Sequence, residues 1–253
     1  TEFDYHTHNF HKITIFISGN VQYFIEGKTY TLNPYDIVLV NRNDIHRIQV
    51  DSSIPYERII VYISPGFMEA YRTTEYNLAY CFEQAREKQS YVLRIPSLET
   101  SSLYKTTQRL ERSFHDHEYA GSLYRQILFL EFMIQLNRAT LKEGIEYLDT
   151  KLYNKKVLDI MNYIQDHLTE TISMDSLASV FYLSKYHMMR LFKAETGVTI
   201  GHYITYRRLL LARRYIHSGM PITDACFACG FQSYSAFSRA YKQEFKEPPR
   251  KLK

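Results

Sequence analysis

Two stretches near the C-terminus decide the fold: residues 184–195 read SKYHMMRLFKAE, and residues 233–244 read SYSAFSRAYKQE. Each stretch opens on a serine, whose hydroxyl can accept a hydrogen bond from a free backbone N–H at the start of a helix. Six pairs of identical or similar residues stand 49 positions apart: Ser184 and Ser233, Met188 and Phe237, Arg190 and Arg239, Phe192 and Tyr241, Lys193 and Lys242, Glu195 and Glu244. The chain therefore contains one amphipathic helix twice.

The two predicted helices separate apolar from polar residues in the same way. The positions expected to face inward are Met188, Leu191 and Phe192 in the first copy and Phe237, Ala240 and Tyr241 in the second. The residues on the opposite face of each helix are expected to be exposed and available to contact a binding partner. In the first copy these are Lys185, Tyr186, Met189, Arg190 and Lys193, and in the second they are Tyr234, Ser235, Ser238, Arg239 and Lys242.

A shorter helix is predicted before each copy, over residues 174–180 and 222–229, with three or four residues between the two helices of each pair. Small residues, Ala178 and Cys226, stand at matched places in the shorter helices. Two helices that cross steeply must approach closely there, which is helix-turn-helix geometry. The second helix of each pair is then available to enter a DNA major groove. One such pattern is weak evidence, whereas two in tandem are strong.

Charge divides the chain in the same way. Residues 155–253 hold 15 Lys and Arg against 8 Asp and Glu, a net +7, while the rest holds 16 against 19, a net −3. A basic half joined to a mildly acidic half indicates that one part meets a polyanion. Double-stranded DNA is the predicted partner of residues 155–253.

These 99 residues resemble the DNA-binding domain of the AraC/XylS transcription regulators. The resemblance rests on residues 230–242, on Phe245 and Pro249, and on Leu177-Ala178, Glu195-Thr196-Gly197 and Tyr203 in the first unit. It implies that a helix over residues 204–217, with Arg208 and Ala212, links the two units. The sequence departs from the family at Lys246, where Gly is usual, at Pro248 and at Leu252-Lys253. We expect the first departure to strain the end of a helix.

The sequence pattern of the N-terminal half predicts strands instead of helices. Short β-rich runs at residues 13–17, 23–25, 30–32, 37–40, 45–50 and 58–63 alternate with turn signals, which is typical of a sandwich or small barrel. Residues 103–117 and 122–141 then carry helical periodicity and predict a helical hairpin. The predicted fold is α+β: a barrel over 1–97, the hairpin over 98–141, a linker over 142–154 and the all-α domain over 155–253.

The second helix of the hairpin carries two apolar faces. Leu123, Ile127, Leu130 and Ile134 form one, and Leu128, Phe132 and Leu136 form the other. One face can pack on the barrel, and the other predicts a homodimer in which the same helix of a second chain covers it. The alternative is that both faces are covered within one chain.

The barrel resembles the cupin-like sensing domain found ahead of such DNA-binding domains, with His6-x-His8, Gly19, Gly27, Pro34-Tyr35-Asp36 and His46. That family commonly has Gly at the Tyr35 position, and its metal-binding members place Glu near Lys12. A lysine there opposes a metal, so no metal or other cofactor is predicted, although three histidines could still hold one. The candidate ligand-binding residues are His6, His8, Phe10, Lys12, Tyr23 and His46.

Three cysteines, Cys81, Cys226 and Cys229, are too few for a secreted disulfide scaffold and favour a reducing cytoplasm. Cys226-x-x-Cys229 could be a redox pair or half a metal site. Both cysteines fall where the resembling family buries small apolar residues, so packing is the better account. No segment is long and apolar enough to span a membrane.

We therefore expect a sequence-specific transcription regulator, and not an enzyme. Its barrel would bind a small-molecule effector, with a carbohydrate as the candidate class because the aromatic residues could stack on a sugar ring. The family resemblance implies activation through contacts with RNA polymerase. Two alternatives stay open at this point: a ligand-independent regulator whose barrel is only a scaffold, and a metal-dependent cupin enzyme.

Overall fold

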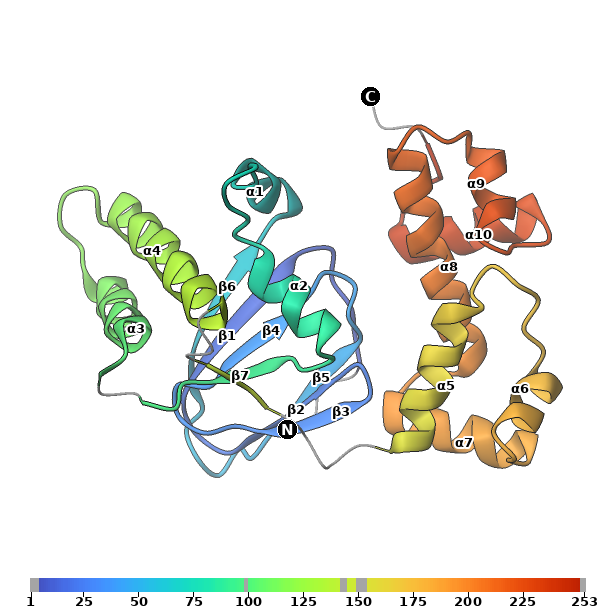
Figure 1. The fold of residues 1–253 in the computed structure, drawn as a ribbon, viewed down its shortest axis with the longest axis horizontal. Helices are drawn as coiled ribbons and strands as arrows, with labels where there is room; N and C mark the ends of the chain where they lie inside the picture. Colours follow the sequence, from blue (N-terminus) through green and yellow to red (C-terminus); the bar gives the residue numbers. More distant parts are fainter. Residues whose placement is uncertain (1–4, 98–99, 142–144, 149–153, 251–253) are drawn as a thin grey trace. The chain divides into compact units, whose positions relative to one another are not determined.

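The computed structural model describes residues 5–97, 100–141, 145–148 and 154–250. By its internal contacts the chain divides into two units, Thr1–Leu152 and Tyr153–Lys253. The first is built on β-sheet and the second is helical (Figure 1). The predicted class, α+β with two domains, is confirmed.

The first unit contains two antiparallel sheets. The larger has the order β6-β1-β4-β7-β8 and the smaller the order β3-β2-β5. The strands are β1 (His11–Ser18), β2 (Val21–Ile25), β3 (Lys28–Thr31), β4 (Ile37–Val40), β5 (His46–Val50), β6 (Glu57–Ile63), β7 (Val92–Arg94) and β8 (Glu146–Tyr147). The first six coincide with the six predicted runs to within a few residues.

Strand β1 is buried on both faces and divides the unit into two layers. Successive side chains of a strand point to opposite faces. Thr14 accepts a hydrogen bond from Tyr23 of the smaller sheet, so the even-numbered side chains face that sheet. His11, one of the odd-numbered residues, lies against Phe82 of a covering helix. The space between the two sheets is therefore lined by the even-numbered residues of β1.

Within the described residues the helices beside the sheets include α1 (Pro65–Ala70), α2 (Tyr80–Glu87), α3 (Ser102–Arg112), the 3-10 turn η2 (Ser113–His115) and α4 (Gly121–Leu141). Figure 1 shows α3 and α4 side by side as the predicted hairpin. Neither α1 nor α2 nor β7 was predicted. Part of the predicted linker, Glu146–Tyr147, forms β8 and pairs with β7, so these two residues belong to the sheet. Residues 142–144 and 149–153 of that linker lie outside the described residues.

Only one of the two apolar faces of α4 is covered. Leu128, Phe132 and Leu136 are fully buried in the core of the first unit. On the other face Leu123 is 55%, Ile127 53% and Ile134 42% exposed, whereas Leu130 is half-buried against the core. The rest of the first unit therefore leaves most of this second face uncovered, and the homodimer stays a prediction.

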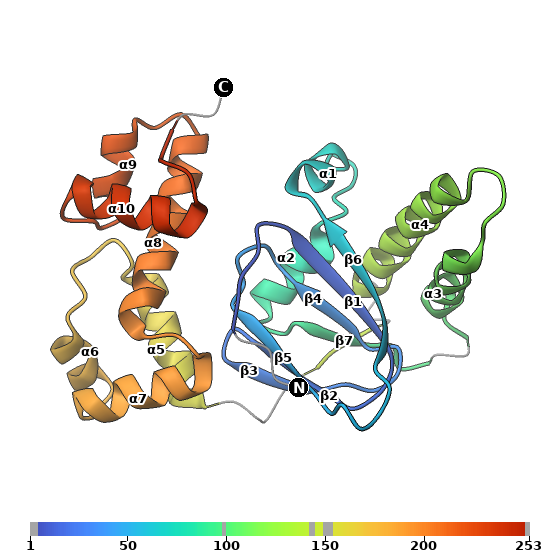
Figure 2. The same cartoon turned by 180° about the vertical axis from the view of Figure 1, so that it is seen from behind.

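The second unit consists of α5 (Lys155–Asp166), α6 (Met174–Val180), α7 (Lys185–Thr196), α8 (Ile200–His217), α9 (Ile222–Ala228) and α10 (Tyr234–Phe245). Figure 2 shows α6 and α7 at one end of α8, and α9 and α10 at the other. Tyr203 packs against Phe192 of α7, whereas Ala212 and Ile216 join the core formed with α9 and α10. Both predicted helix-turn-helix units are thus present. In the part of the chain that the structure covers, no helix combines the length and apolarity needed to cross a membrane.

The linking helix is longer than the sequence indicated. The predicted helix began at residue 204, but α8 begins at Ile200, because Thr199 caps it by accepting a hydrogen bond from the backbone N–H of His202. Eighteen residues at about 1.5 Å each give a rod of about 27 Å, instead of the roughly 20 Å expected from the shorter helix.

Arg208 of α8 lies between the turn before α10 and the loop after α5. Its guanidinium donates hydrogen bonds to the carbonyl oxygens of Leu168, at 2.9 Å, and Glu170. Gly230, in the turn before α10, lies against the same group. A Cβ added to Gly230 would stand 2.9 Å from both Arg208 Nε and the Leu168 oxygen. Only a glycine fits there without moving the loop or the arginine.

Cys226 and Cys229 lie in the core beside α8, fully buried and unbridged. Burial raises the pKa of the Cys229 thiol to about 11, with the neighbouring Cys226 as a smaller cause. A protonated, inaccessible thiol is a poor nucleophile and a poor metal ligand. The packing interpretation of this Cys-x-x-Cys pair is confirmed.

Helices α7 and α10 are each followed by a residue in the left-handed region, but the two residues differ. It is Gly197 after α7, with a φ of 76°, and Lys246 after α10, with a φ of 60°. Tyr35, the other residue that replaces a family glycine, has a φ of 67°. A residue with a Cβ is disfavoured in this region. The predicted strain at Lys246 is therefore present.

Replacing Lys246 by Gly should stabilise the second unit by about 1 kcal/mol, because the end of α10 keeps its conformation without the Cβ penalty. Chemical unfolding of the full chain followed by far-ultraviolet circular dichroism measures this, since helices dominate that signal. The matched control is Gly197→Ala, which should destabilise by a similar amount. A Lys246→Gly protein no more stable than the parent would contradict the assignment of strain.

Candidate nucleic-acid interface and effector site

Local hydrogen bonds fix the start of both recognition helices. Ser184 accepts from the backbone N–H of His187 at 3.3 Å, and Ser233 accepts from that of Ala236 at 3.4 Å. Both serines have extended backbone conformations, as helix-capping residues do. The predicted caps are confirmed, and the 49-residue repeat in sequence is a repeat in structure.

The residues predicted to contact DNA lie on the outer surfaces of these helices. The opposite side of each helix is buried, through Met188 and Phe192 in α7 and through Phe237 and Tyr241 in α10. Nine of the ten candidates are exposed and Ser238 is half-buried: Lys185, Tyr186, Met189, Arg190 and Lys193 on α7, and Tyr234, Ser235, Ser238, Arg239 and Lys242 on α10. Each helix thus offers one row of side chains able to reach base edges or phosphates.

Several of these side chains are already positioned. Arg239 Nε lies 3.4 Å from the backbone oxygen of Ser235 one turn earlier. The guanidinium of Arg190 lies 5.9 Å from the centre of the Tyr186 ring. By contrast, Lys185 pairs with Asp175 of α6 at 3.0 Å, so its charge is partly neutralised within the unit.

Tyr182, next to the start of α7, is an exposed aromatic residue that was not among the candidates. It lies in the turn between α6 and α7 with a φ of 52°, and its side chain is 95% exposed. Gly230 is left-handed at the matched place after α9. The turn between α9 and α10 is one residue longer than the turn between α6 and α7. Tyr182 and Gly230 are therefore 48 positions apart, and the 49-residue repeat did not align them.

In the first unit the six candidate ligand-binding residues form one connected cluster. Lys12 Nζ lies 2.9 Å from His46 Nε2 and 5.9 Å from the centre of the Tyr23 ring. The ring centres of His6 and His8 lie 4.3 and 4.7 Å from that of His46. Phe10 stacks on His8 with 4.0 Å between ring centres. Lys12, Tyr23 and His46 are buried, His8 and Phe10 are half-buried, and His6 is exposed.

Burial and charge hold the imidazoles of His8 and His46 neutral. Burial lowers the pKa of His46 to about 2, with the Lys12 charge as the next cause. The same two causes, in the same order, lower the pKa of His8 to about 4. Burial lowers the pKa of Lys12 to about 8, with a further contribution from Arg58. At neutral pH the rings of His8 and His46 are therefore neutral beside the Lys12 cation.

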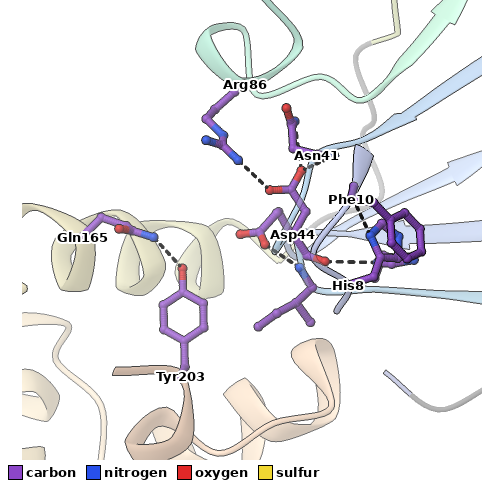
Figure 3. A network of polar contacts seen from close by, with 10 residues as sticks. His8, Phe10, Asn41, Asp44, Arg86, Gln165 and Tyr203 are labelled. Carbon is purple, nitrogen blue, oxygen red and sulfur yellow. Dashed lines mark hydrogen bonds and ion pairs between the residues drawn. The ribbon is translucent and has the colours of Figure 1, made fainter. Parts of the chain in front are cut away.

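A hydrogen-bond network below the cluster orients His46. Its Nδ1–H donates to the backbone oxygen of Asp44 at 3.1 Å. The carboxylate of Asp44 accepts from Asn41 and from Arg86 (Figure 3). The buried loop thus fixes both the ring and its tautomer, and leaves Nε2 of His46 as the acceptor that faces Lys12.

Two neighbours of the cluster were not among the candidates. Thr14 accepts the hydrogen bond of the Tyr23 hydroxyl at 3.3 Å, and Tyr62 packs edge-on against Phe10. Thr14 follows Lys12 by two positions on β1 and could have been found from the period of the strand. Tyr62 comes from β6, whose pairing with β1 the sequence alone does not reveal.

A metal ion does not fit the three histidines. The nitrogen of His46 that would bind it already accepts from an ammonium group. Nδ1 of His8 faces the backbone oxygen of Phe10. Across the described residues, no group of three or more His, Cys, Asp or Glu side chains is arranged to hold a metal.

Comparison with known proteins identifies both units. An AraC-like ligand-binding domain matches residues 1–133, and a helix-turn-helix domain matches residues 177–253. The HTH-type transcriptional activator RhaS of Enterobacter sp. (strain 638) is 26% identical over 255 residues, which cover 99% of this chain and 87% of that protein. RhaS of Escherichia coli (strain SMS-3-5 / SECEC) is 24% identical over 253 residues, covering 100% and 88%.

Among solved structures, ToxT from Vibrio cholerae is 15% identical, with a TM-score of 0.39, over 98% of this chain and 91% of that one. The DNA-binding domain of AdpA, solved in complex with a target DNA, is 22% identical, with a TM-score of 0.36, over 37% and 86%. The family models place a ligand-binding domain ahead of a helix-turn-helix domain, which agrees with the two units into which this chain folds. The chain belongs to the AraC family of DNA-binding transcription regulators.

Proposed function

We propose that this regulator reads two neighbouring major grooves of one DNA site with α7 and α10, in response to an effector bound between the two sheets. The duplicated recognition helix carries this proposal, because the same positions are exposed in both copies. The net charge of +7 in residues 155–253 supports it further, since a polyanion is the natural partner of such a surface.

The dimensions of α8 agree with this arrangement. Helix α8 is about 27 Å long and has a recognition helix packed at each end. The distance between α7 and α10 can therefore approach the roughly 34 Å that separates successive major grooves on one face of B-DNA. The exposed residues of α7 and α10 differ, so the two halves of the site should differ in sequence. Met189 offers only apolar contacts, such as with a thymine methyl group, whereas Arg190 and Arg239 can read guanine.

Effector binding would act by favouring one arrangement of the two units over another, and so change which DNA sites a dimer can hold. The RhaS relatives are named transcriptional activators, which supports activation, with RNA polymerase as a further partner. A carbohydrate effector agrees with aromatic side chains such as Phe10 beside the polar cluster. A cytoplasmic location follows from this function.

Neither alternative function is favoured. A metal-dependent enzyme would need the His46 nitrogen that Lys12 occupies. A ligand-independent scaffold would be more stable with apolar residues at Lys12 and His46, because burial of an unneutralised cation costs free energy. The relatives, too, are regulators.

Arg190→Ala and Arg239→Ala should each weaken binding to a selected DNA site about 5- to 150-fold and relax base preference only in the groove of the changed helix. Lys242→Ala should weaken binding to all sequences alike and reduce the salt slope by about one, because it contacts phosphate. Fluorescence anisotropy on a site selected from random duplexes measures both. Arg112→Ala, which removes an exposed arginine from α3, is the control. Equal loss of preference in both grooves from either arginine change would contradict the assignment.

We further propose a homodimer formed through the exposed face of α4. Ile127→Glu with Ile134→Glu should convert the dimer to a monomer in light scattering at about 10 µM, a concentration at which mass action favours a dimer of moderate affinity. Ile54→Glu is the matched control, because Ile54 is 46% exposed in the loop between β5 and β6. Circular dichroism should show both variants folded. A parent chain that is itself monomeric would remove this proposal.

A further inference from the structure

Lys12 is a buried cation with no counter-ion among the described residues. Its side chain lies between the two sheets, and the residue is 8% exposed. Its one hydrogen-bond partner is His46 Nε2 at 2.9 Å, and within the described residues no carboxylate lies at ion-pair distance from its ammonium group. Buried lysines are almost always paired, because burial of an unpaired charge costs several kcal/mol.

His46 does not supply the missing charge. Its Nδ1 faces the backbone oxygen of Asp44, which can only accept, so the proton of the ring resides on Nδ1. Nε2 then offers a lone pair to the ammonium group and nothing more. The neighbouring Arg58 adds positive charge, since it is the cation that helps to lower the pKa of Lys12 to about 8 after burial. The cluster therefore has one unfilled requirement, an anion.

His8 adds a second unfilled requirement. Its Nδ1 lies 2.7 Å from the backbone oxygen of Phe10, so Nδ1 carries the proton and Nε2 carries a lone pair. Nε2 is buried and finds no hydrogen-bond donor among the residues described. The stacked ring of Phe10 holds the imidazole in place (Figure 3). A lone pair in this position calls for a donor such as a hydroxyl group.

We propose that the effector is a hydroxy-carboxylate of the sugar-acid class, whose carboxylate pairs with Lys12 and whose hydroxyl donates to His8 Nε2. This inference rests on the proposed function, in which the space between the sheets is the effector site. A neutral sugar would satisfy His8 but leave Lys12 unpaired. A simple anion would do the reverse. Only a molecule with both groups fills both requirements.

The test compares acids with their neutral parents on the full chain. Isothermal titration with galacturonate and galactose, and with glucuronate and glucose, at constant ionic strength, should show that at least one acid binds about tenfold or more tightly than its parent, because a charge-assisted hydrogen bond is added. Lys12→Met should abolish that preference. Lys105→Met, which removes an exposed lysine from α3, should retain it.

Other outcomes overturn the inference. It fails if neutral and acidic sugars bind alike, if Lys12→Met keeps the preference, or if no acid binds. Inorganic phosphate bound as tightly as the best acid would show an oxyanion site that makes no use of His8. Should Lys12→Met not fold, His8→Phe gives the second readout: it keeps the stack on Phe10 and removes the lone pair, so acid affinity should fall about fivefold or more.

DNA binding measured in parallel separates this inference from the proposed function. An acid that binds through Lys12 and changes the affinity for DNA supports both. An acid that binds through Lys12 without changing that affinity supports the ligand class and contradicts its role as effector. A neutral sugar that changes the affinity supports an effector-responsive regulator and overturns the ligand class.

Discussion

The hydrogen bonds of Arg208 hold the DNA-binding unit together. Its guanidinium joins three segments that are distant in sequence: the linking helix that carries it, the loop after α5 whose carbonyls accept from it, and the turn in which Gly230 lies against it. Together with α8 and the close backbone approach of Gly230 to the Leu168 and Thr169 oxygens, this contact restricts the relative rotation of the two helix-turn-helix units. Their spacing and orientation decide which DNA they can read, so this half-buried polar contact underlies the specificity that we propose.

The two units place their functional residues differently. In the second unit, the side of each recognition helix that packs into the core is mostly apolar. The residues proposed to contact DNA can therefore be identified as those that remain exposed. In the first, a lysine and a histidine lie inside the sheet layers. Stability alone would replace them with apolar residues. Their presence, with the Asp44 network that orients His46, is best explained by a ligand that completes them.

Much of this architecture could be predicted from the sequence, because the features concerned are periodic. The 49-residue repeat identified the recognition helices and their serine caps, and alternation identified the first six strands. Helices α1 and α2 and strands β7 and β8 escaped prediction because they are short and are held by tertiary contacts, such as the pairing of β7 with β4. The early start of α8 depends on Thr199, whose capping role was overlooked. The cluster around Lys12 was predicted as a set of residues, but its chemistry depends on hydrogen bonds to backbone oxygens that no pattern reveals.

We propose above that one chain reads two adjacent major grooves on the same face of DNA. Hydroxyl-radical and base-methylation footprinting of the full-length protein, on a site selected from random duplexes, tests this directly. We expect each chain to protect two major-groove segments about 10 base pairs apart, with different sequences in the two segments. Protection of a single groove per chain, or of two segments on opposite faces of the duplex, would contradict it.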